Sequence, residues 1–193
     1  MKRLALIIIG LCLLTQSLIA DEKTILKQHF LSKIDEVILI VENNTIDREL
    51  RNSKIVQILT PMLDFTLMAK LSLGKKWREL NSIDQTNFVN LYVKRMKQSY
   101  SSKIDSYSNE KVEVTEINLF KKNRIQLTTN LLTKENKLEI VYKFYKPKQL
   151  KIDKDRWLIY DIVILGVSIL KTDKAQFREF LRTKTIQQLM KEL

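Results

Sequence analysis

The sequence is poor in the residues that carry most enzyme chemistry and most metal binding. It contains one cysteine, Cys12, and one histidine, His29. A disulfide framework, a zinc site and Ser-His or Cys-His catalysis therefore lack the residues that they need. Three glycines and two prolines are too few for a glycine-rich phosphate loop or a flexible linker. The composition indicates one domain that is stabilised by its hydrophobic core alone.

The N-terminus has the organisation of a secretory signal peptide. Lys2 and Arg3 form a basic start, residues 4–14 form an apolar core, and a short polar segment ends at the small residue Ala20. An uncleaved membrane anchor is the alternative, but the apolar core is well short of the ~18 residues that a membrane span needs. We therefore expect residues 1–20 to be a signal peptide and residues 21–193 to form one exported domain.

Charge of one sign dominates the chain. The formal net charge is +12, and removal of Lys2 and Arg3 with the signal peptide would leave +10. A basic surface attracts nucleic acid, anionic membranes and acidic proteins. Export argues against nucleic acid, so membrane surfaces or acidic docking partners remain. Lys75 and Lys76, beside Gly74, are candidates for such a contact near a pocket mouth, although lysines also serve solubility alone.

The first half of the chain has helical periodicity. Two helices are predicted between residues 24 and 59, separated by the polar residues 42–45. Thr60 followed by Pro61 predicts the N-cap and first residue of a third helix, which should end at Gly74. Residues 82–85, Ser-Ile-Asp-Gln, form a capping box that predicts the start of a long fourth helix.

The second half changes to a period of two residues. Strands are predicted over residues 111–120, 123–133, 137–146 and 156–165, which are rich in β-branched and aromatic residues. Short polar turns join them, and two helices close the chain over 173–181 and 184–193. The pattern predicts an α+β domain with N-terminal helices packed on a curved antiparallel four-stranded sheet.

The last predicted strand is apolar on both alternating faces. Trp157 and Ile159 belong to one face, and Leu158 and Ile162 to the other. Such a strand is buried on both sides, either because helices cover both faces or because one face lines an apolar cavity. The residues alone leave both explanations open.

Two carboxylates, Asp64 and Asp161, are embedded in apolar sequence. A buried carboxylate requires a cationic or hydrogen-bonding partner, and Lys70, Arg78 and Arg95 are candidates. A structural role is favoured over catalysis. The alternative is an exported enzyme that uses one of these acids with a tyrosine on a hydrophobic substrate. A third possibility is a basic periplasmic adaptor with a solid core and no ligand.

Two long stretches contain a specific set of matching positions. In residues 63–104 these are Asp64, Phe65, Met68, Leu73, Gly74, Trp77, Arg78, Leu80, Gln85 and Phe88. In residues 157–193 they are Trp157, Tyr160, Asp161, Gly166, Val167, Ser168, Gln176, Phe177, Leu181 and Arg182. In order and spacing these stretches resemble the MlaC family, also called toluene-tolerance or ABC-transporter auxiliary proteins.

The resemblance implies a periplasmic phospholipid carrier of a Gram-negative envelope. Such a protein is not an enzyme, has no cofactor or metal, and holds the lipid's acyl tails in an apolar cavity between sheet and helices. It would act as a monomer that shuttles between an outer-membrane lipoprotein complex and an inner-membrane ABC transporter with an MCE-type subunit. This traffic maintains the lipid asymmetry of the outer membrane. The strong basic charge of this chain departs from the family.

The expected cavity would be lined by one face of each strand and by two of the helices. From the helices we predict Phe65, Met68, Leu91, Met96 and Tyr100. From the strands we predict Val112, Val114, Leu127, Ile140, Tyr142, Ile162 and Ile164. An error of one residue in register would turn a strand's predicted side chains to the opposite face.

Overall fold

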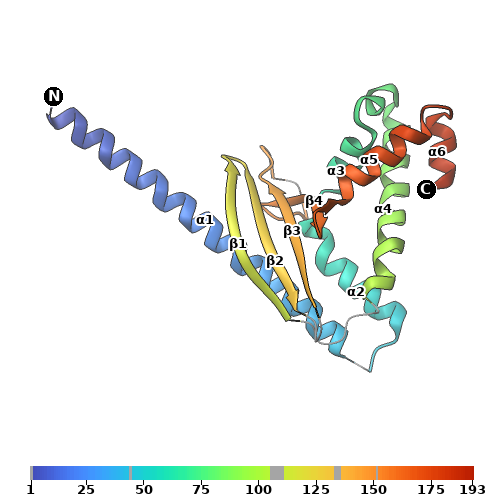
Figure 1. The fold of residues 1–193 in the computed structure, drawn as a ribbon, viewed down its shortest axis with the longest axis horizontal. Coiled ribbons are helices and arrows are strands. Elements are labelled where there is room, and N and C mark those ends of the chain that lie inside the picture. Colours follow the sequence, from blue (N-terminus) through green and yellow to red (C-terminus); the bar gives the residue numbers. More distant parts are fainter. Residues whose placement is uncertain (1, 44, 105–110, 133–135, 151) are drawn as a thin grey trace.

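The computed structural model describes residues 2–43, 45–104, 111–132, 136–150 and 152–193. Side chains are described from residue 22 onward, except within residues 100–104. Strand β1 lies at one edge of an open antiparallel sheet, and helices α3 to α6 gather beyond the opposite edge, next to β4 (Figure 1). The long helix α1 crosses the sheet and extends well past it (Figure 1).

The N-terminal part contains the two predicted helices and the predicted break between them. Helix α1 spans Lys2–Glu42 and helix α2 spans Arg48–Leu59. Asp47 caps α2, because its carboxylate accepts a hydrogen bond from the Leu50 amide at 2.9 Å. In the described part of the chain, no helix has both the length and the hydropathy that crossing a bilayer requires.

The third helix starts later than Thr60 and Pro61 predict. Thr60–Met62 form a short 3₁₀ helix, η1, and the chain is then extended before α3, which spans Phe65–Leu73. The Asp64 amide donates to the Ile159 carbonyl at 2.9 Å, so Leu63 pairs with the sheet and cannot be helical. Asp64 is the N-cap, and its carboxylate accepts from the Leu67 amide at 3.0 Å. Tertiary pairing therefore overrides the local proline signal.

Helix α3 ends at Gly74, as predicted. Gly74 has a φ of 60°, a backbone conformation that favours glycine, and it leads into the 3₁₀ helix η2 over Gly74–Glu79. Helix α4 spans Ser82–Ile104, but Asn81, not Ser82, accepts the capping hydrogen bond from the Asp84 amide at 2.9 Å. The Gln85 side chain instead donates to the Trp77 and Leu80 carbonyls, which fixes the turn before α4.

The sheet contains the four predicted strands and one short addition. The strands are β1 at Lys111–Lys121, β2 at Arg124–Leu132, β3 at Lys137–Tyr145, β4 at Leu158–Ile164 and β5 at Val167–Ser168. They lie in the order β1-β2-β3-β4-β5, so each strand neighbours the next along the chain. This antiparallel meander confirms the predicted α+β fold class, with β5 as the strand that sequence periodicity did not reveal.

The turn between β4 and β5 has two residues with positive φ. Leu165 has a φ of 49° and Gly166 a φ of 79°, a backbone conformation that favours glycine. Ser168 then caps helix α5, Ile169–Phe180, by accepting from the Lys171 amide at 3.0 Å. Helix α5 therefore begins four residues before the predicted start. Helix α6, Ile186–Glu192, completes the described fold.

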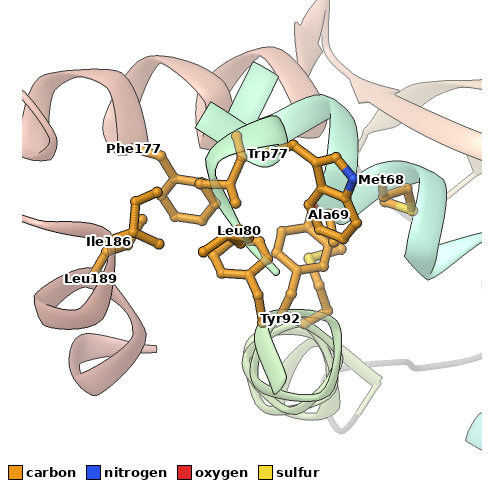
Figure 2. Packing of buried hydrophobic residues seen from close by; sticks show 11 residues of the cluster. Met68, Ala69, Trp77, Leu80, Tyr92, Phe177, Ile186 and Leu189 are labelled. Carbon is orange, nitrogen blue, oxygen red and sulfur yellow. The ribbon is translucent and has the colours of Figure 1, made fainter. Parts of the chain in front are cut away.

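The hydrophobic residues form two clusters. In the first, which we call the helical cluster, residues of helices α3 to α6 and of η2 pack together with Tyr92 and Phe177 (Figure 2). Phe88 belongs to the same cluster. In the second, the sheet cluster, Leu26 and Phe30 of α1 pack against Leu127 and Phe144 of the sheet. The helical cluster is a compactly packed core. Some of the residues that pack against the sheet cluster also line a cavity, which is described below.

Candidate functional site

An apolar cavity of about 360 Å³ lies between strands β3 and β4 and the helices around them. We call it the apolar cavity. The sheet contributes Ile140, Tyr142, Ile162 and Ile164. Helices α1 and α2 contribute Val37, Val41, Ile55, Val56 and Leu59. Residues from η1 onward add Thr60, Leu63, Phe65, Met68, Met96, Lys97 and Ile169. Its volume lies at the lower end of the ~300–1,000 Å³ that is usual for ligand pockets.

Strand register explains why the sheet side of the cavity is continuous. Ile140 pairs with Ile164, and Tyr142 pairs with Ile162. Side chains of paired residues point to the same face of a sheet, so these four form one apolar surface. Opposite them, Ile55 and Leu59 are four residues apart on α2 and therefore share one helix face.

The polar groups of the cavity wall leave the interior uncharged. Burial raises the pKa of the Tyr142 phenol to about 12, although a hydrogen bond with Thr129 acts in the opposite direction. The phenol is therefore neutral at physiological pH. The Thr60 hydroxyl donates to the Val56 carbonyl at 2.6 Å. Among the described lining residues only Lys97 carries a charge, and its side chain is exposed.

The structure brings many of the predicted lining residues together. The predicted residues that line the cavity are Phe65, Met68, Met96, Ile140, Tyr142, Ile162 and Ile164. These strand residues therefore share one face of the sheet, as predicted. Their contact with a lipid remains a prediction.

Four other predicted residues lie elsewhere. Leu127 pairs with Tyr142 and points to the same face, but it is buried beneath α1 in the sheet cluster. Val114 packs against the same cluster, and both Val112 and Val114 belong to the edge strand β1, two strands away from the cavity. Leu91 is half-buried on α4 and does not line the cavity. The side chain of Tyr100 lies outside the described residues.

Sequence reasoning missed the wall formed by α1 and α2. Val37 and Val41 are four residues apart, as are Ile55 and Leu59, so both pairs carry an ordinary amphipathic signal. That signal shows that a helix face is covered, but it is the same for a face against a packed core and a face against a cavity. Only the tertiary arrangement distinguishes the two.

Asp161 is buried and has a complete set of partners. Its carboxylate accepts from Lys143 Nζ at 2.8 Å, from the Ser168 hydroxyl at 2.8 Å, and from the Leu170 amide at 3.2 Å. The expectation of a cationic and hydroxyl environment is met, but the proposed partners Lys70, Arg78 and Arg95 are wrong for this residue. The carboxylate joins β3, β4 and the start of α5, outside the lining of the apolar cavity.

Asp64 and Asp173 are also buried carboxylates. The Tyr145 hydroxyl donates to Asp64, and burial together with this carboxylate raises the pKa of Tyr145. Asp173, which lies in polar sequence that gives no sign of burial, accepts from the Tyr92 hydroxyl at 2.7 Å and from Arg95 Nη1 at 2.8 Å. Arg95 therefore belongs to Asp173. Neither carboxylate belongs to the lining of the apolar cavity.

The single histidine and the two lysines beside Gly74 also lie outside the cavity lining. His29 is a partly exposed residue of α1, and its Nε2 lies 2.7 Å from Asp155 Oδ2. Lys75 and Lys76 do not line the apolar cavity, so the predicted pocket mouth beside Gly74 is wrong. The cavity contacts the first turn of α3, whereas these lysines follow its last turn. Among the described residues, no three His, Cys, Asp or Glu side chains gather into a possible metal site.

The fold and the cavity together define a class: an α+β protein with an open antiparallel sheet and an apolar pocket between sheet and helices. The family model for the MlaC protein matches residues 32–193. The chain therefore belongs to the MlaC family, which confirms the resemblance seen in its sequence.

A solved structure supports the same fold. A phospholipid-binding protein from Ralstonia solanacearum, determined in complex with a phospholipid, superposes with a TM-score of 0.71. The two sequences are 16% identical, and the match covers 85% of this chain and 92% of that one. At this identity the likeness concerns the fold. A comparison with curated proteins found no match.

Proposed function

We propose that the protein is a periplasmic phospholipid carrier. It holds acyl tails in the apolar cavity and moves phospholipids between the outer and inner membranes for an ABC transporter, thereby maintaining outer-membrane lipid asymmetry. The carrier binds and releases its cargo without changing it chemically. The observation that carries the proposal is the continuous apolar surface of Ile140, Tyr142, Ile162 and Ile164 facing α1 and α2 across an open space.

The energetics of lipid transfer explain why such a cavity suffices. Each methylene that leaves a bilayer for water costs about 0.8 kcal/mol, so an unassisted phospholipid rarely crosses an aqueous compartment. A carrier needs a dry apolar surface for the tails and no reactive groups. Membership of the MlaC family and the phospholipid bound to the Ralstonia solanacearum protein of the same fold support this assignment.

The cellular setting is part of the proposal. Residues 1–20 act as a signal peptide, and residues 21–193 form the single periplasmic domain. The carrier works as a monomer, and it docks alternately with an outer-membrane lipoprotein complex and with the MCE-type subunit of an inner-membrane ABC transporter. Its net charge of +12 before processing suits acidic docking surfaces.

Mass spectrometry of the purified protein tests lipid carriage directly. The full chain is expressed with export to the periplasm of a Gram-negative host and purified without detergent. Native mass spectrometry and lipid extraction are expected to find phospholipid near one molecule per chain, and the intact mass reports whether residues 1–20 have been removed. A folded protein that contains no lipid and takes none from phospholipid vesicles would overturn the proposal.

A pair of neighbouring substitutions identifies the site. Ile140→Arg places a charge in the apolar cavity, whereas Glu139→Arg adds the same side chain at an exposed position on the opposite face of β3. Ile140→Arg is expected to lose lipid and Glu139→Arg to retain it. Equal lipid content in two folded variants would show that the lipid does not occupy this cavity.

A further inference from the structure

A second, more polar cavity adjoins the apolar one. It has a volume of about 350 Å³ and lies between α4, α5 and the β4–β5 turn. Met96, Ile164 and Ile169 line both cavities, so the two are adjacent spaces with a shared wall. The polar residues of the second cavity are Arg95, Ser99, Thr172, Asp173 and Gln176. We call it the polar cavity.

Arg95 is held in place within the polar cavity. Its Nη1 donates to Asp173 Oδ1 at 2.8 Å, its Nη2 donates to Gln176 Oε1 at 3.0 Å, and its guanidinium lies 5.3 Å from the centre of the Phe177 ring. A guanidinium carries five N–H donors, so these two bonds leave others for a ligand. About 28% of the side chain is exposed, which makes those donors accessible.

Asp173 holds the Arg95 guanidinium in this position. Its carboxylate is buried and also accepts from the Tyr92 hydroxyl at 2.7 Å. Because this buried carboxylate accepts hydrogen bonds from both Tyr92 and Arg95, it fixes the orientation of the guanidinium before a ligand binds. This lowers the entropy cost of binding. The same helix places Lys97 at the apolar cavity, with Met96 between the two basic residues.

We propose that the polar cavity holds the phospholipid head group and that Arg95 binds its phosphate. This inference rests on the proposed function. An amphiphile needs apolar space for its tails and, directly beside it, a polar environment for its phosphodiester, which either solvent or polar side chains can provide. The two cavities supply this pair across Met96, Ile164 and Ile169. Arginine suits a phosphate because its planar donors can bind two oxygens at once.

Competition between two lipids with the same acyl chains tests the inference. Delipidated full chain is loaded with a fluorescent phospholipid, which is then displaced by phosphatidylethanolamine or by the matching diacylglycerol, which has no phosphate. The unmodified protein is expected to prefer the phospholipid. Arg95→Gln removes the proposed phosphate donor and is expected to reduce that preference about tenfold, the effect of losing one charge-assisted hydrogen bond.

A second variant leaves the Arg95–Asp173 ion pair intact. Arg95→Gln leaves Asp173 without its cation and can unfold the chain for that reason alone. Gln176→Glu keeps the shape and the bond to Arg95 but adds a negative charge that competes with the phosphate, so it is expected to lower the preference by a similar factor. Lys94→Gln removes a charge from the residue beside Arg95 that lines neither cavity, and it is the matched control.

The outcomes separate this inference from the proposed function. If the unmodified protein binds neither lipid, the proposed function fails, and the head-group site fails with it. If it binds lipid but Gln176→Glu and folded Arg95→Gln keep the original preference, the head-group site alone is wrong. An equal loss of preference in Lys94→Gln would also overturn it, because the effect would then reflect general surface charge.

Discussion

The helical cluster and the apolar cavity are both formed by hydrophobic residues, but they are packed in opposite ways. In the helical cluster, Phe88, Tyr92 and Phe177 are buried, and their ring centres lie 5.9 to 6.4 Å apart. The cavity wall is mainly aliphatic, and its side chains face each other across open space. One small domain therefore contains a solid core that secures stability and a hollow region that remains available for a ligand.

The comparison shows where each region draws its strength. Aromatic rings in edge-to-face contact fill space efficiently and join η2, α4 and α5, and non-aromatic residues of α3 and α6 pack in the same cluster. Ile140 and Ile164 of the cavity wall are held mainly by the hydrogen bonds of the sheet, which do not require close side-chain packing. Substitutions in the helical cluster should therefore mainly lower stability, whereas substitutions in the cavity wall should mainly change lipid binding.

The largest expected effect is the removal of a ring from the solid core. Phe88→Ala should lower the free energy of unfolding by about 3–5 kcal/mol, because Phe88 is fully buried and the void cannot be refilled. Ile140→Ala in the cavity wall should cost less than about 2 kcal/mol, since this half-buried side chain already faces open space. Urea unfolding of delipidated protein measures both. Equal losses would mean that the two regions are equally packed.

Enlarging a side chain tests the comparison in the other direction. Ala69→Phe places a ring in the helical cluster and should lower the free energy of unfolding by at least about 1–3 kcal/mol through overpacking. Val56→Phe adds a ring to the apolar cavity, where space exists, and should leave stability almost unchanged while reducing bound lipid. Thermal unfolding and lipid extraction are the two measurements. A destabilised Val56→Phe variant with normal lipid content would contradict this prediction.

Asp161 should separate stability from lipid binding. Asp161→Asn weakens the bonds to Lys143 and Ser168 and should lower the free energy of unfolding by about 1–3 kcal/mol. Lipid content should not change, because Asp161 lies outside the apolar cavity. Asp35→Asn, at an exposed position of α1, is the control and should be neutral. A stable Asp161→Asn protein that fails to transfer lipid would assign this carboxylate to function.

The smallest expected effect concerns surface charge near the helical cluster. If docking is steered electrostatically, the rate of lipid transfer between partner-bearing vesicles should fall as salt shortens the screening length from about 10 Å at 0.1 M to about 3 Å at 1 M. Charge reversal at Lys75 should also slow transfer, and reversal at Lys76 less so, because Lys76 already pairs with Glu79 at 2.8 Å. Bound lipid should be retained throughout. A rate that ignores both salt and charge reversal would exclude steering.

Much of the fold could be predicted because each element has a strong local signal. The change from helical to alternating periodicity near residue 111 separates helices from strands, and Gly74 and Gly166 lie at two of the positions with positive φ. Helix starts were less predictable. Thr60 and Ser82 are good capping residues, but Asp64 and Asn81 act as the caps because pairing with the sheet and the turn before α4 decide where the chain becomes helical.

The candidate site was predictable only in part. Alternation placed Ile140, Tyr142 and Ile162 on one face, and this is the face of β3 and β4 that lines the cavity. It could not show that α1 covers Leu127, because this depends on how a distant segment crosses the sheet. Arg95 was also assigned to the wrong carboxylate, since the approach of α4 and α5 that joins it to Asp173 leaves no local signal in the sequence.

The junction at Leu63 and Asp64 attaches one wall of the cavity directly to the sheet. Asp64 caps α3 while its own amide is bonded to Ile159 of β4, so the start of the helix and the sheet are joined through one residue. The Tyr145 hydroxyl adds a second attachment to the same carboxylate. The sheet and α3 are therefore joined directly. If the cavity has to widen for the proposed ligand, we expect α2, which follows the break after α1, to move relative to this joined unit.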